Sequence, residues 1–389
     1  MGPIDPDWRL RIDKRFTSLR GFAALTVMLA HYQYMGFLPG APVFKYSGQC
    51  GLMVFFFLSS FLLCHSLMSD PNWTVRPHRS LIVYAVNRVF RIFPLLFVVI
   101  ALTFWNRSSF FPAAIGYWEA LRESLTLGKA PSVLWTIPVE LTFYIYLPIV
   151  LALTMLATRS RLGAALLGLS YLAWCVAIAI ARHDGVPASL WMTLGFHHYA
   201  NSFVGGALAY ALLASGRIRF PRCGVWIAWI APLVALCAYP FVYFTLFHGD
   251  ASMAELARPG AWQSYYDVVF PFAPLVVGAV IYGLLHPSES PLSRILQTRV
   301  LQRAGELSFG VYLIHLPMIV FFGSRFGYGP WQFCASIATT FAAAAVLSTL
   351  IERPGIAFGR DLGRWFSRAP RCGRLSQAWA KRAASASSV

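Results

Sequence analysis

Apolar runs of about 20 residues recur along nearly the whole chain, and an α-helix needs a run of that length to cross the hydrocarbon core of a bilayer. Of the 389 residues, 58% are hydrophobic and only 12% are charged, roughly half the charged share of a soluble domain. The sequence therefore predicts an all-α integral membrane protein with about ten transmembrane helices. The predicted spans are 19–38, 50–68, 84–105, 136–157, 162–181, 196–214, 225–247, 267–285, 307–324 and 331–350.

No polar stretch between these spans is long enough for a soluble domain, so residues 16–355 are predicted to form one transmembrane domain. Residues 1–15 are polar and basic, and they are interpreted as a cytoplasmic N-terminal segment. Residues 356–389 are basic and then rich in Ala and Ser, a composition typical of a partly disordered cytoplasmic tail.

The net charge of +17 is unevenly distributed along the chain. Roughly three quarters of the 32 Lys and Arg residues fall in alternate connections and at the two ends, as the positive-inside rule expects for segments on the cytoplasmic side. Both termini are therefore predicted to be cytoplasmic. The basic charge is explained by topology and by contact with anionic membrane lipids, so nucleic acid is not predicted as a partner.

The seven cysteines are scattered, without a CxxC pair. Neither a disulfide framework nor a metal site is predicted from them.

The first apolar span contains two groups that lipid does not favour. Arg20 lies just inside the span, and His31 lies three helical turns further on, roughly 16 Å deeper. A titratable side chain at that depth marks a functional site by default, and imidazole is suited to general-base catalysis near neutral pH. The alternative for His31 is a neutral side chain that only hydrogen-bonds a neighbouring helix. Arg15, just before the span, could likewise be an ordinary positive-inside residue without a role in the site.

The third span begins with a pair of arginines on one helix face. Arg91 is the third residue after Arg88, so the two guanidinium groups lie on the same face of a helix. Two such groups can hold phosphate oxygens through paired hydrogen bonds. Simple anchoring to lipid phosphate remains the alternative.

The fourth span carries Glu140 among aromatic residues that include Trp135 and Tyr144. A carboxylate in this setting needs a partner, and it could bind a sugar hydroxyl, orient a histidine or pair with arginine. The aromatic residues are compatible with carbohydrate stacking or with an ordinary interfacial belt. This end of the span is expected at the outer face, opposite Arg88 and Arg91.

Two further titratable positions lie near the C-terminus. His315 falls inside the ninth span, and Glu352 closes the tenth beside Arg353. The adjacent Glu352 and Arg353 are also compatible with an interfacial ion pair.

Taken together and in order, six segments resemble the membrane-bound acyltransferase family 3, in its polysaccharide O-acyltransferase type without a fused hydrolase-like domain. The first motif is the most specific, because it joins Arg20-Gly21 to His31 across an apolar interval. Two residues depart from the usual pattern: Ser60 replaces a glycine, and Pro138 replaces a small polar residue. The segments are RFTSLRGFAALTVMLAHY (15–32), VFFFLSSFLL (54–63), NRVFRIFP (87–94), LWTIPVELTFY (134–144), ELSFGVYLIHLP (306–317) and IERP (351–354).

The resemblance implies a ten-helix enzyme of the bacterial inner membrane that moves an acyl group, most commonly acetyl from acetyl-CoA, to a hydroxyl of a surface or exported glycan. The implied catalytic residues are His31, Arg20 and Glu140, and the implied donor-binding residues are Arg88, Arg91 and Arg15. The implied acceptor-binding residues are Glu140, Trp135, Tyr144 and His315. No metal is expected, and the oligomeric state is left open.

Two rival interpretations come from other functional classes. In a secondary transporter of an anionic solute, the buried Arg and His residues would bind the solute and relay protons. The sequence shows none of the internal repeats that are common in transporters. In a scaffold subunit of a glycan-export complex, the same residues would have no chemistry.

Overall fold

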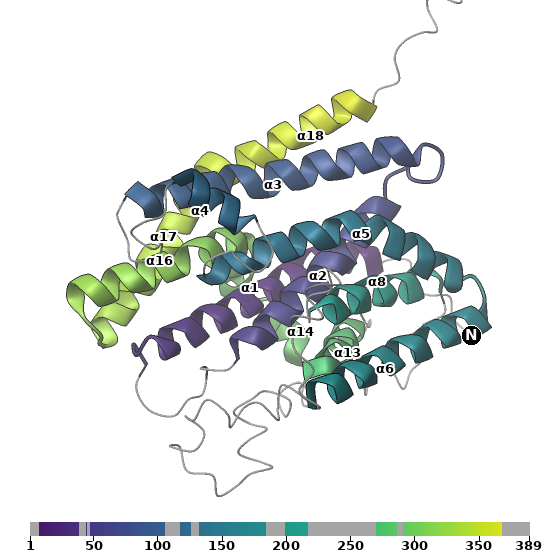
Figure 1. The fold of residues 1–389 in the computed structure, drawn as a ribbon, viewed down its shortest axis with the longest axis horizontal. Coiled ribbons are helices and arrows are strands. Elements are labelled where there is room, and N and C mark those ends of the chain that lie inside the picture. The colour runs from purple at the N-terminus through teal and green to yellow at the C-terminus, as the bar shows by residue number, and fades with distance from the viewer. Residues whose placement is uncertain are drawn as a thin grey trace, which may run out of the picture.

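The computed structural model describes residues 8–38, 44, 47–105, 117–125, 132–183, 199–216, 270–285 and 291–367. Within these residues every regular element is helical. The helices lie side by side in an elongated bundle, with α3 and α18 along one edge and α6 along the opposite edge (Figure 1).

The helices and their bounds are α1 (Trp8–Tyr34), α2 (Gly48–Met68), α3 (Pro77–Trp105), α4 (Tyr117–Ser124), η1 (Ser132–Trp135), α5 (Thr136–Ala157), α6 (Arg161–His183), α8 (Ala200–Ala214), η2 (Phe270–Phe272), α13 (Ala273–Leu285), α14 (Pro291–Leu296), α15 (Arg299–Glu306), α16 (Ser308–Phe326), α17 (Pro330–Leu347), η3 (Ser348–Glu352) and α18 (Arg353–Ser367).

Six helical stretches in the described part of the chain are long and apolar enough to cross a membrane: α2, α3, η1 with α5, α6, α16, and α17 with α18. Helices α8 and α13 are apolar but shorter. Every predicted span except 225–247, which lies outside the described residues, overlaps a described helix. The all-α class and the membrane-spanning character are therefore confirmed, while the count of ten spans stays a prediction.

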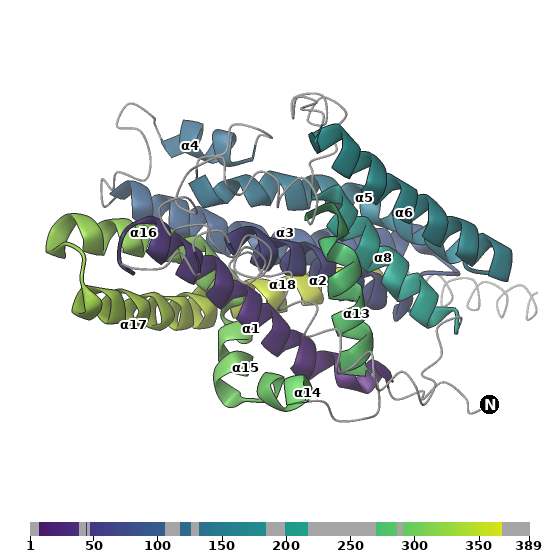
Figure 2. The ribbon, with the colours of Figure 1, turned by 90° about the horizontal axis from the view of Figure 1, so that it is seen from below.

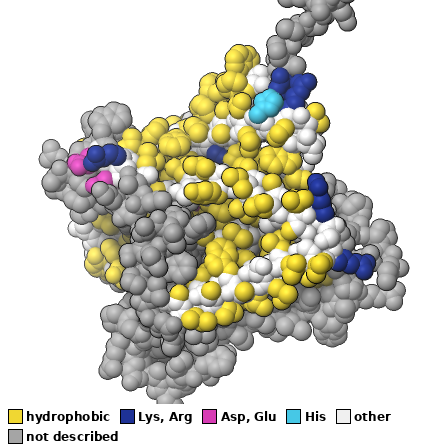
Figure 3. Space-filling model, turned by 45° about the vertical axis from the view of Figure 1, so that its right-hand side comes forward, with side chains coloured by type: hydrophobic (Ala, Val, Ile, Leu, Met, Phe, Trp, Pro, Cys, Tyr) yellow, Lys and Arg dark blue, Asp and Glu magenta, His cyan; other side chains and the backbone are white. Residues whose placement is uncertain are grey.

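The surface of the bundle carries the apolar side chains that a lipid-facing protein needs. Helix α6 exposes Leu162, Leu166, Leu169 and Ile180 at helical spacing, each more than half accessible. Figure 3 shows apolar side chains over most of the described surface on one face, with most of the visible Lys and Arg side chains near its edges. A face of this kind is stable in hydrocarbon and would aggregate in water.

Several helices are longer than the apolar runs that predict them. Helix α1 begins at Trp8 and α3 at Pro77, whereas the spans are predicted from 19 and 84. The charged first turns of α1 and α3 lower the local hydropathy, so the apolar run alone misses these turns. Arg88 therefore lies about three turns into α3, roughly 17 Å from its start.

Backbone contact between α1 and α15 depends on glycine at two positions. A Cβ at Gly21 would meet the carbonyl oxygen of Leu301, and one at Gly305 would meet the carbonyl oxygen of Thr17. Figure 2 shows α15 crossing α1 at this contact. The Arg-Gly pair of the first motif thus has a packing role at Gly21 beside the charged role of Arg20.

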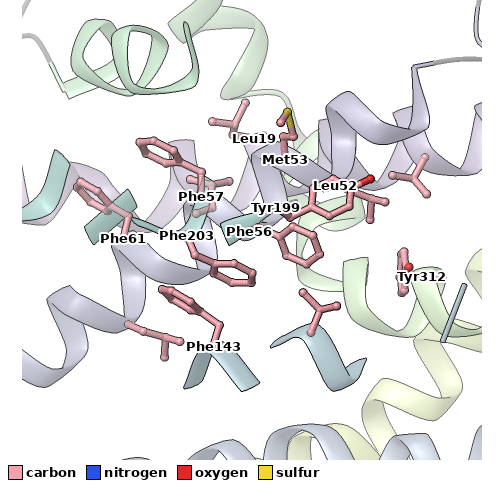
Figure 4. Packing of buried hydrophobic residues seen from close by; sticks show 14 of the residues in the cluster. Leu19, Leu52, Met53, Phe56, Phe57, Phe61, Phe143, Tyr199, Phe203 and Tyr312 are labelled. Carbon is pink, nitrogen blue, oxygen red and sulfur yellow. The ribbon is translucent and has the colours of Figure 1, made fainter. Parts of the chain in front are cut away.

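Aromatic side chains from α2, α5 and α8 fill the centre of the bundle (Figure 4). Phe203 stacks on Phe56 and on Phe143, with ring centroids 4.7 Å and 3.9 Å apart. Ser60 is fully buried, and its Cβ faces Gly206 of α8, so the serine that departs from the family pattern occupies a close helix contact.

Helices α17 and α18 form one continuous helical stretch, Pro330–Ser367, joined by the π-helical turn η3. Helix α18 runs beside α3 (Figure 1). The helix therefore passes through residue 355, where the transmembrane domain is predicted to end, and continues to Ser367. Residues 368–389 of the predicted tail lie outside the described residues.

Candidate active site

A cavity of about 400 Å³ opens between α1, α2, α3, α5, α16 and α18. Its walls are mixed, with mostly apolar side chains from α2 and all of the charged side chains from α1, α3, α5 and α18. This volume falls in the range of sites that hold small molecules and cofactors. The charged residues of its wall are Arg20, Arg88, Arg91, Glu140 and Arg360.

Three of the sequence-predicted arginines meet in this cavity. Arg20 comes from α1, and Arg88 and Arg91 come from α3. Arg20 also lies close enough to Arg91 and Glu140 for direct electrostatic interaction. Like charges inside an apolar bundle repel, so a cluster of this kind is suited to an anionic ligand.

Glu140 lies in the same cavity, on the second turn of α5. One of its oxygens, Oε2, accepts a hydrogen bond of 2.8 Å from the Tyr144 hydroxyl, one turn further along the helix. The Tyr84 hydroxyl donates to the Tyr144 carbonyl at 3.1 Å and so joins α3 to α5 at this level. Pro138 is the third residue of α5, where a missing N–H breaks no helical hydrogen bond, so this departure leaves Glu140 on a regular helix.

The prediction that Glu140 lies on the opposite side from Arg88 and Arg91 is therefore wrong, since all three side chains line one cavity. The turn η1, which leads directly into α5, is bonded to α16 just over one turn from the start of α16. The Tyr312 hydroxyl donates to the Val133 carbonyl of η1 at 2.7 Å. Helix α5 thus begins inside the bundle, and α3 carries its arginines deep to the same level.

Arg91 forms an ion pair with Glu352 across α3 and η3, at 3.4 Å. The Glu352 side chain is only 3% exposed and that of Arg91 is 26% exposed. The alternative of an interfacial pair between Glu352 and Arg353 is therefore wrong, since Glu352 turns inward to α3 and Arg353 is exposed. A buried carboxylate requires such a partner.

Several polar atoms around the cavity are buried without a hydrogen-bond partner in the described structure. They include Nε of Arg88, Oγ of Ser308 and Oε2 of Glu352. Arg88 and Ser308 belong to the cavity wall. Buried polar atoms are normally satisfied, so the wall keeps hydrogen-bonding capacity for a ligand or for water.

His31 and His315 form a pair beside the cavity. The Nε2 atom of His315 lies 3.3 Å from Nδ1 of His31, and the ring centroids are 5.0 Å apart. Nδ1 of His31 also lies 2.8 Å from the Val27 carbonyl, and Nδ1 of His315 lies 2.7 Å from the Tyr312 carbonyl.

These contacts fix the tautomer of each ring. A carbonyl oxygen only accepts, so Nδ1 carries the proton in both histidines. Nε2 of His315 then accepts from Nδ1 of His31, which leaves the lone pair of His31 on its Nε2. In the neutral form of His31, Nε2 is therefore the nitrogen that can take up a proton.

Tyr312 connects the histidine pair to the cavity. Its ring lines the cavity and lies 5.8 Å from the ring of His315, centroid to centroid. Its hydroxyl also contacts Thr136 Oγ1 at 3.1 Å. Tyr312 therefore forms part of the wall between the arginine cluster and the two histidines.

Apart from the histidine pair, two sequence-predicted site residues lie outside the cavity wall, Arg15 and Trp135. The Nη1 atom of Arg15 donates to the Leu284 carbonyl at the end of α13, at 2.5 Å. Trp135 packs in the aromatic core, with its ring 5.3 Å from that of Tyr199. The structure brings together Arg20, Arg88, Arg91, Glu140 and Tyr144 in the cavity, and His31 with His315 beside it.

Sequence reasoning missed Tyr312, Ser308 and Arg360 as parts of the cavity wall. Tyr312 and Ser308 stand in the same motif as His315, three and seven residues before it, so helical periodicity was an available signal. For Arg360 the signal was the spacing of Gly355, Gly359 and Gly363, which is typical of a helix that packs closely. Among the described residues, no three His, Cys, Asp or Glu side chains gather in a way that could hold a metal ion.

A family model described as an acyltransferase domain, of acyltransferase family 3, matches residues 13–349. The chain is also similar to Acyltransferase MdmB from Streptomyces mycarofaciens, with 24% identity over 401 aligned residues that cover 90% of this chain and 92% of the relative. No solved structure matches the chain.

Proposed function

The chain belongs to acyltransferase family 3, and from that premise we propose that it transfers an acyl group, most commonly acetyl, from acyl-CoA to a hydroxyl of a bacterial envelope or exported polysaccharide. The family membership makes it a membrane acyltransferase and favours this reading over an anion transporter or a scaffold subunit. The donor and the acceptor are the proposed parts.

The observation that carries the proposal is the joining of two polar sites inside an apolar bundle. Tyr312 lines the arginine-rich cavity, and its ring lies 5.8 Å from that of His315, whose Nε2 is 3.3 Å from Nδ1 of His31. The arginines can bind the phosphates of a phosphorylated thioester donor. The histidine can take the proton of an acceptor hydroxyl.

The donor fits the charge of the cavity. Coenzyme A carries a pyrophosphate and a ribose phosphate, and guanidinium groups bind such oxygens in pairs. Arg88 and Arg91 share one face of α3, and Arg20 stands opposite on α1. We place the phosphates among these side chains and the acyl thioester toward Tyr312, with Glu140 holding Arg20 in position.

The transfer step follows from the tautomer of His31. Nε2 of His31 takes the proton of the acceptor hydroxyl while its oxygen attacks the thioester carbonyl. The C–S bond breaks as the ester C–O bond forms, and the CoA thiolate leaves and takes the proton from His31. His315 holds the His31 ring in place and accepts from its Nδ1–H throughout.

The proposed location is the bacterial inner membrane, with both termini in the cytoplasm, where acyl-CoA is available. Single cysteines placed in a cysteine-free background test this orientation. An impermeant thiol reagent added from outside should modify probes in 106–133 and spare probes in 286–305. The reverse labelling pattern would overturn the assignment of donor and acceptor sides.

The activity is tested with purified full-length protein in proteoliposomes, acetyl-CoA labelled in its acetyl group, and envelope polysaccharide as acceptor. We expect acetyl ester on the polysaccharide with wild-type protein and none with His31→Gln. Folded wild-type protein that neither transfers nor hydrolyses acetyl from acetyl-CoA would contradict the proposal. Comparing the acetyl content of envelope glycans with and without the gene then identifies the acceptor.

A further inference from the structure

Helix α18 packs tightly against the helix that carries Arg88 and Arg91. Gly355, Gly359 and Gly363 recur every four residues on one face of α18. A Cβ added at Gly355 would lie 2.9 Å from the Phe90 carbonyl oxygen, and one at Gly359 would lie 2.8 Å from Phe90 Cβ. Small residues at this spacing allow two helices to approach closely.

Polar contacts hold the two ends of this helix pair. At one end Arg91 pairs with Glu352, just before α18 begins. At the other end Nη1 of Arg79 donates to the Ser367 carbonyl at 3.2 Å. Helix α18 is therefore a fixed wall of the site rather than a tail.

This packing brings Arg360 to the cavity. Arg360 follows Gly359 and lies one turn after Ile356, and both Arg360 and Ile356 line the cavity. Arg360 is exposed, whereas Ile356 is half-buried, so Arg360 stands at the mouth.

The charge of the cavity wall exceeds what its own carboxylates balance. Four guanidinium groups, those of Arg20, Arg88, Arg91 and Arg360, face a single carboxylate in the wall, Glu140. Glu352 outside the wall pairs with only one of them. The buried Nε of Arg88 and Oγ of Ser308 still have no hydrogen-bond partner in the described structure. The excess of positive charge is suited to a ligand with more than one negative group.

We propose that Arg360 is a further donor-binding residue, which holds the phosphate at the end of the donor remote from the thioester. This inference rests on the proposed acyl-CoA donor. With the thioester directed toward Tyr312, the 3′-phosphate of the ribose is the group nearest the mouth. Arg360 lies beyond residue 349, where the family match ends, so this contact is supplied by the chain's own C-terminal helix.

The experiment compares two ligands and three proteins. Binding of CoA and of 3′-dephospho-CoA is measured by calorimetry on the full chain in phosphatidylcholine nanodiscs, which contain no anionic headgroup as a competitor. The proteins are wild type, Arg360→Ala and the control Arg364→Ala. Arg364 lies one turn further along α18, outside the cavity wall, and pairs with Asp361 at the surface.

We expect Arg360→Ala to weaken CoA binding about tenfold, as the loss of one charge-assisted contact does, and to leave dephospho-CoA binding unchanged. Arg364→Ala should bind both ligands as wild type does. An equal loss for both ligands, or no loss for either, would overturn the assignment of Arg360 to the terminal phosphate while leaving the donor intact. Wild-type protein that binds neither ligand overturns the acyl-CoA donor, and this inference with it.

Discussion

The arginine cavity and the histidine pair are both polar sites within one apolar bundle, yet they are built in opposite ways. The cavity wall leaves Nε of Arg88 and Oγ of Ser308 without partners in the described structure and gathers like charges. In the histidine pair, both nitrogens of His315 and Nδ1 of His31 are engaged at 3.3 Å or less. The first site keeps hydrogen-bonding capacity for a ligand or for water, whereas these nitrogens of the second are bonded to each other and to the backbone.

This difference separates binding from chemistry. A site that must release its ligand benefits from groups that only the ligand satisfies. A general base benefits from a ring that is held in one tautomer and one orientation before the substrate arrives. Changes to the cavity should therefore affect donor affinity, and changes to the pair should affect the rate of transfer.

The largest effect is expected at His31. His31→Gln keeps most of the side-chain size and removes the base, so transfer should fall about 100- to 10,000-fold. Binding of CoA, measured by calorimetry, should stay unchanged. A variant that retained a large fraction of wild-type transfer would make His31 a structural hydrogen bonder and His315 the next candidate base.

A smaller effect on the same rate is expected at His315. His315→Leu removes one of the two acceptors for Nδ1–H of His31 and leaves only the Val27 carbonyl, so the less firmly held base should slow transfer about 100-fold. Because His315 acts through His31, adding His315→Leu to His31→Gln should cost almost nothing further. The check is the single-turnover rate of the double variant. If that rate fell by the product of the two single-variant factors, His315 would have a role independent of His31.

Arg91 should affect affinity rather than rate. In a Glu352→Gln background, which avoids a buried unpaired carboxylate, Arg91→Ala should weaken CoA binding by about 1.5–3 kcal/mol. Arg91→Lys should restore the binding only partly, since lysine lacks the planar fork. The control is Arg303→Ala, which removes an exposed pair with Glu306 on α15. If the Arg88/Arg91 double alanine variant bound CoA as wild type does, the donor-binding role would be wrong and anchoring to lipid phosphate would be the better interpretation of both arginines.

The smallest effect on function is expected at Arg15, which bonds the end of α13 instead of facing the cavity. Arg15→Gln should lower the free energy of unfolding by about 1 kcal/mol through the lost hydrogen bond and leave CoA affinity unchanged. Thermal unfolding and calorimetry on the same sample check both parts. A tenfold weaker affinity would extend the donor site to Arg15.

Much of this molecule follows from local pattern. Apolar length predicts the helices, and the family resemblance carried by the first motif is confirmed by the match over residues 13–349. The pairing of Arg88 with Arg91 on one face of α3 required only helical periodicity. These features depend on neighbours in the sequence, so the sequence is sufficient for them.

The features that the sequence does not predict depend on contacts between helices that are distant in the chain. The position of Glu140 follows from the start of α5 inside the bundle, which is set by Tyr312 and Val133. The partner of Glu352 is Arg91, distant in sequence, rather than its neighbour Arg353. Helix α18 is basic and amphipathic, so its composition resembles that of a cytoplasmic tail. The face that packs against α3 consists of glycines, which do not raise the hydropathy of the segment.

The π-helical turn η3 sets the direction in which the side chains of α18 point. A π turn accommodates one residue more than the α-helical turn it replaces, and each residue of an α-helix advances the side-chain direction by roughly 100°. The extra residue thus resets the rotational phase between α17 and α18. Were Ser348–Glu352 regular α-helix with one residue fewer, the glycine face and Arg360 would swing about a quarter turn off α3. The one extra residue therefore rotates α18 relative to α17, so that one continuous helix packs against α16 along its first part and against α3 along its second.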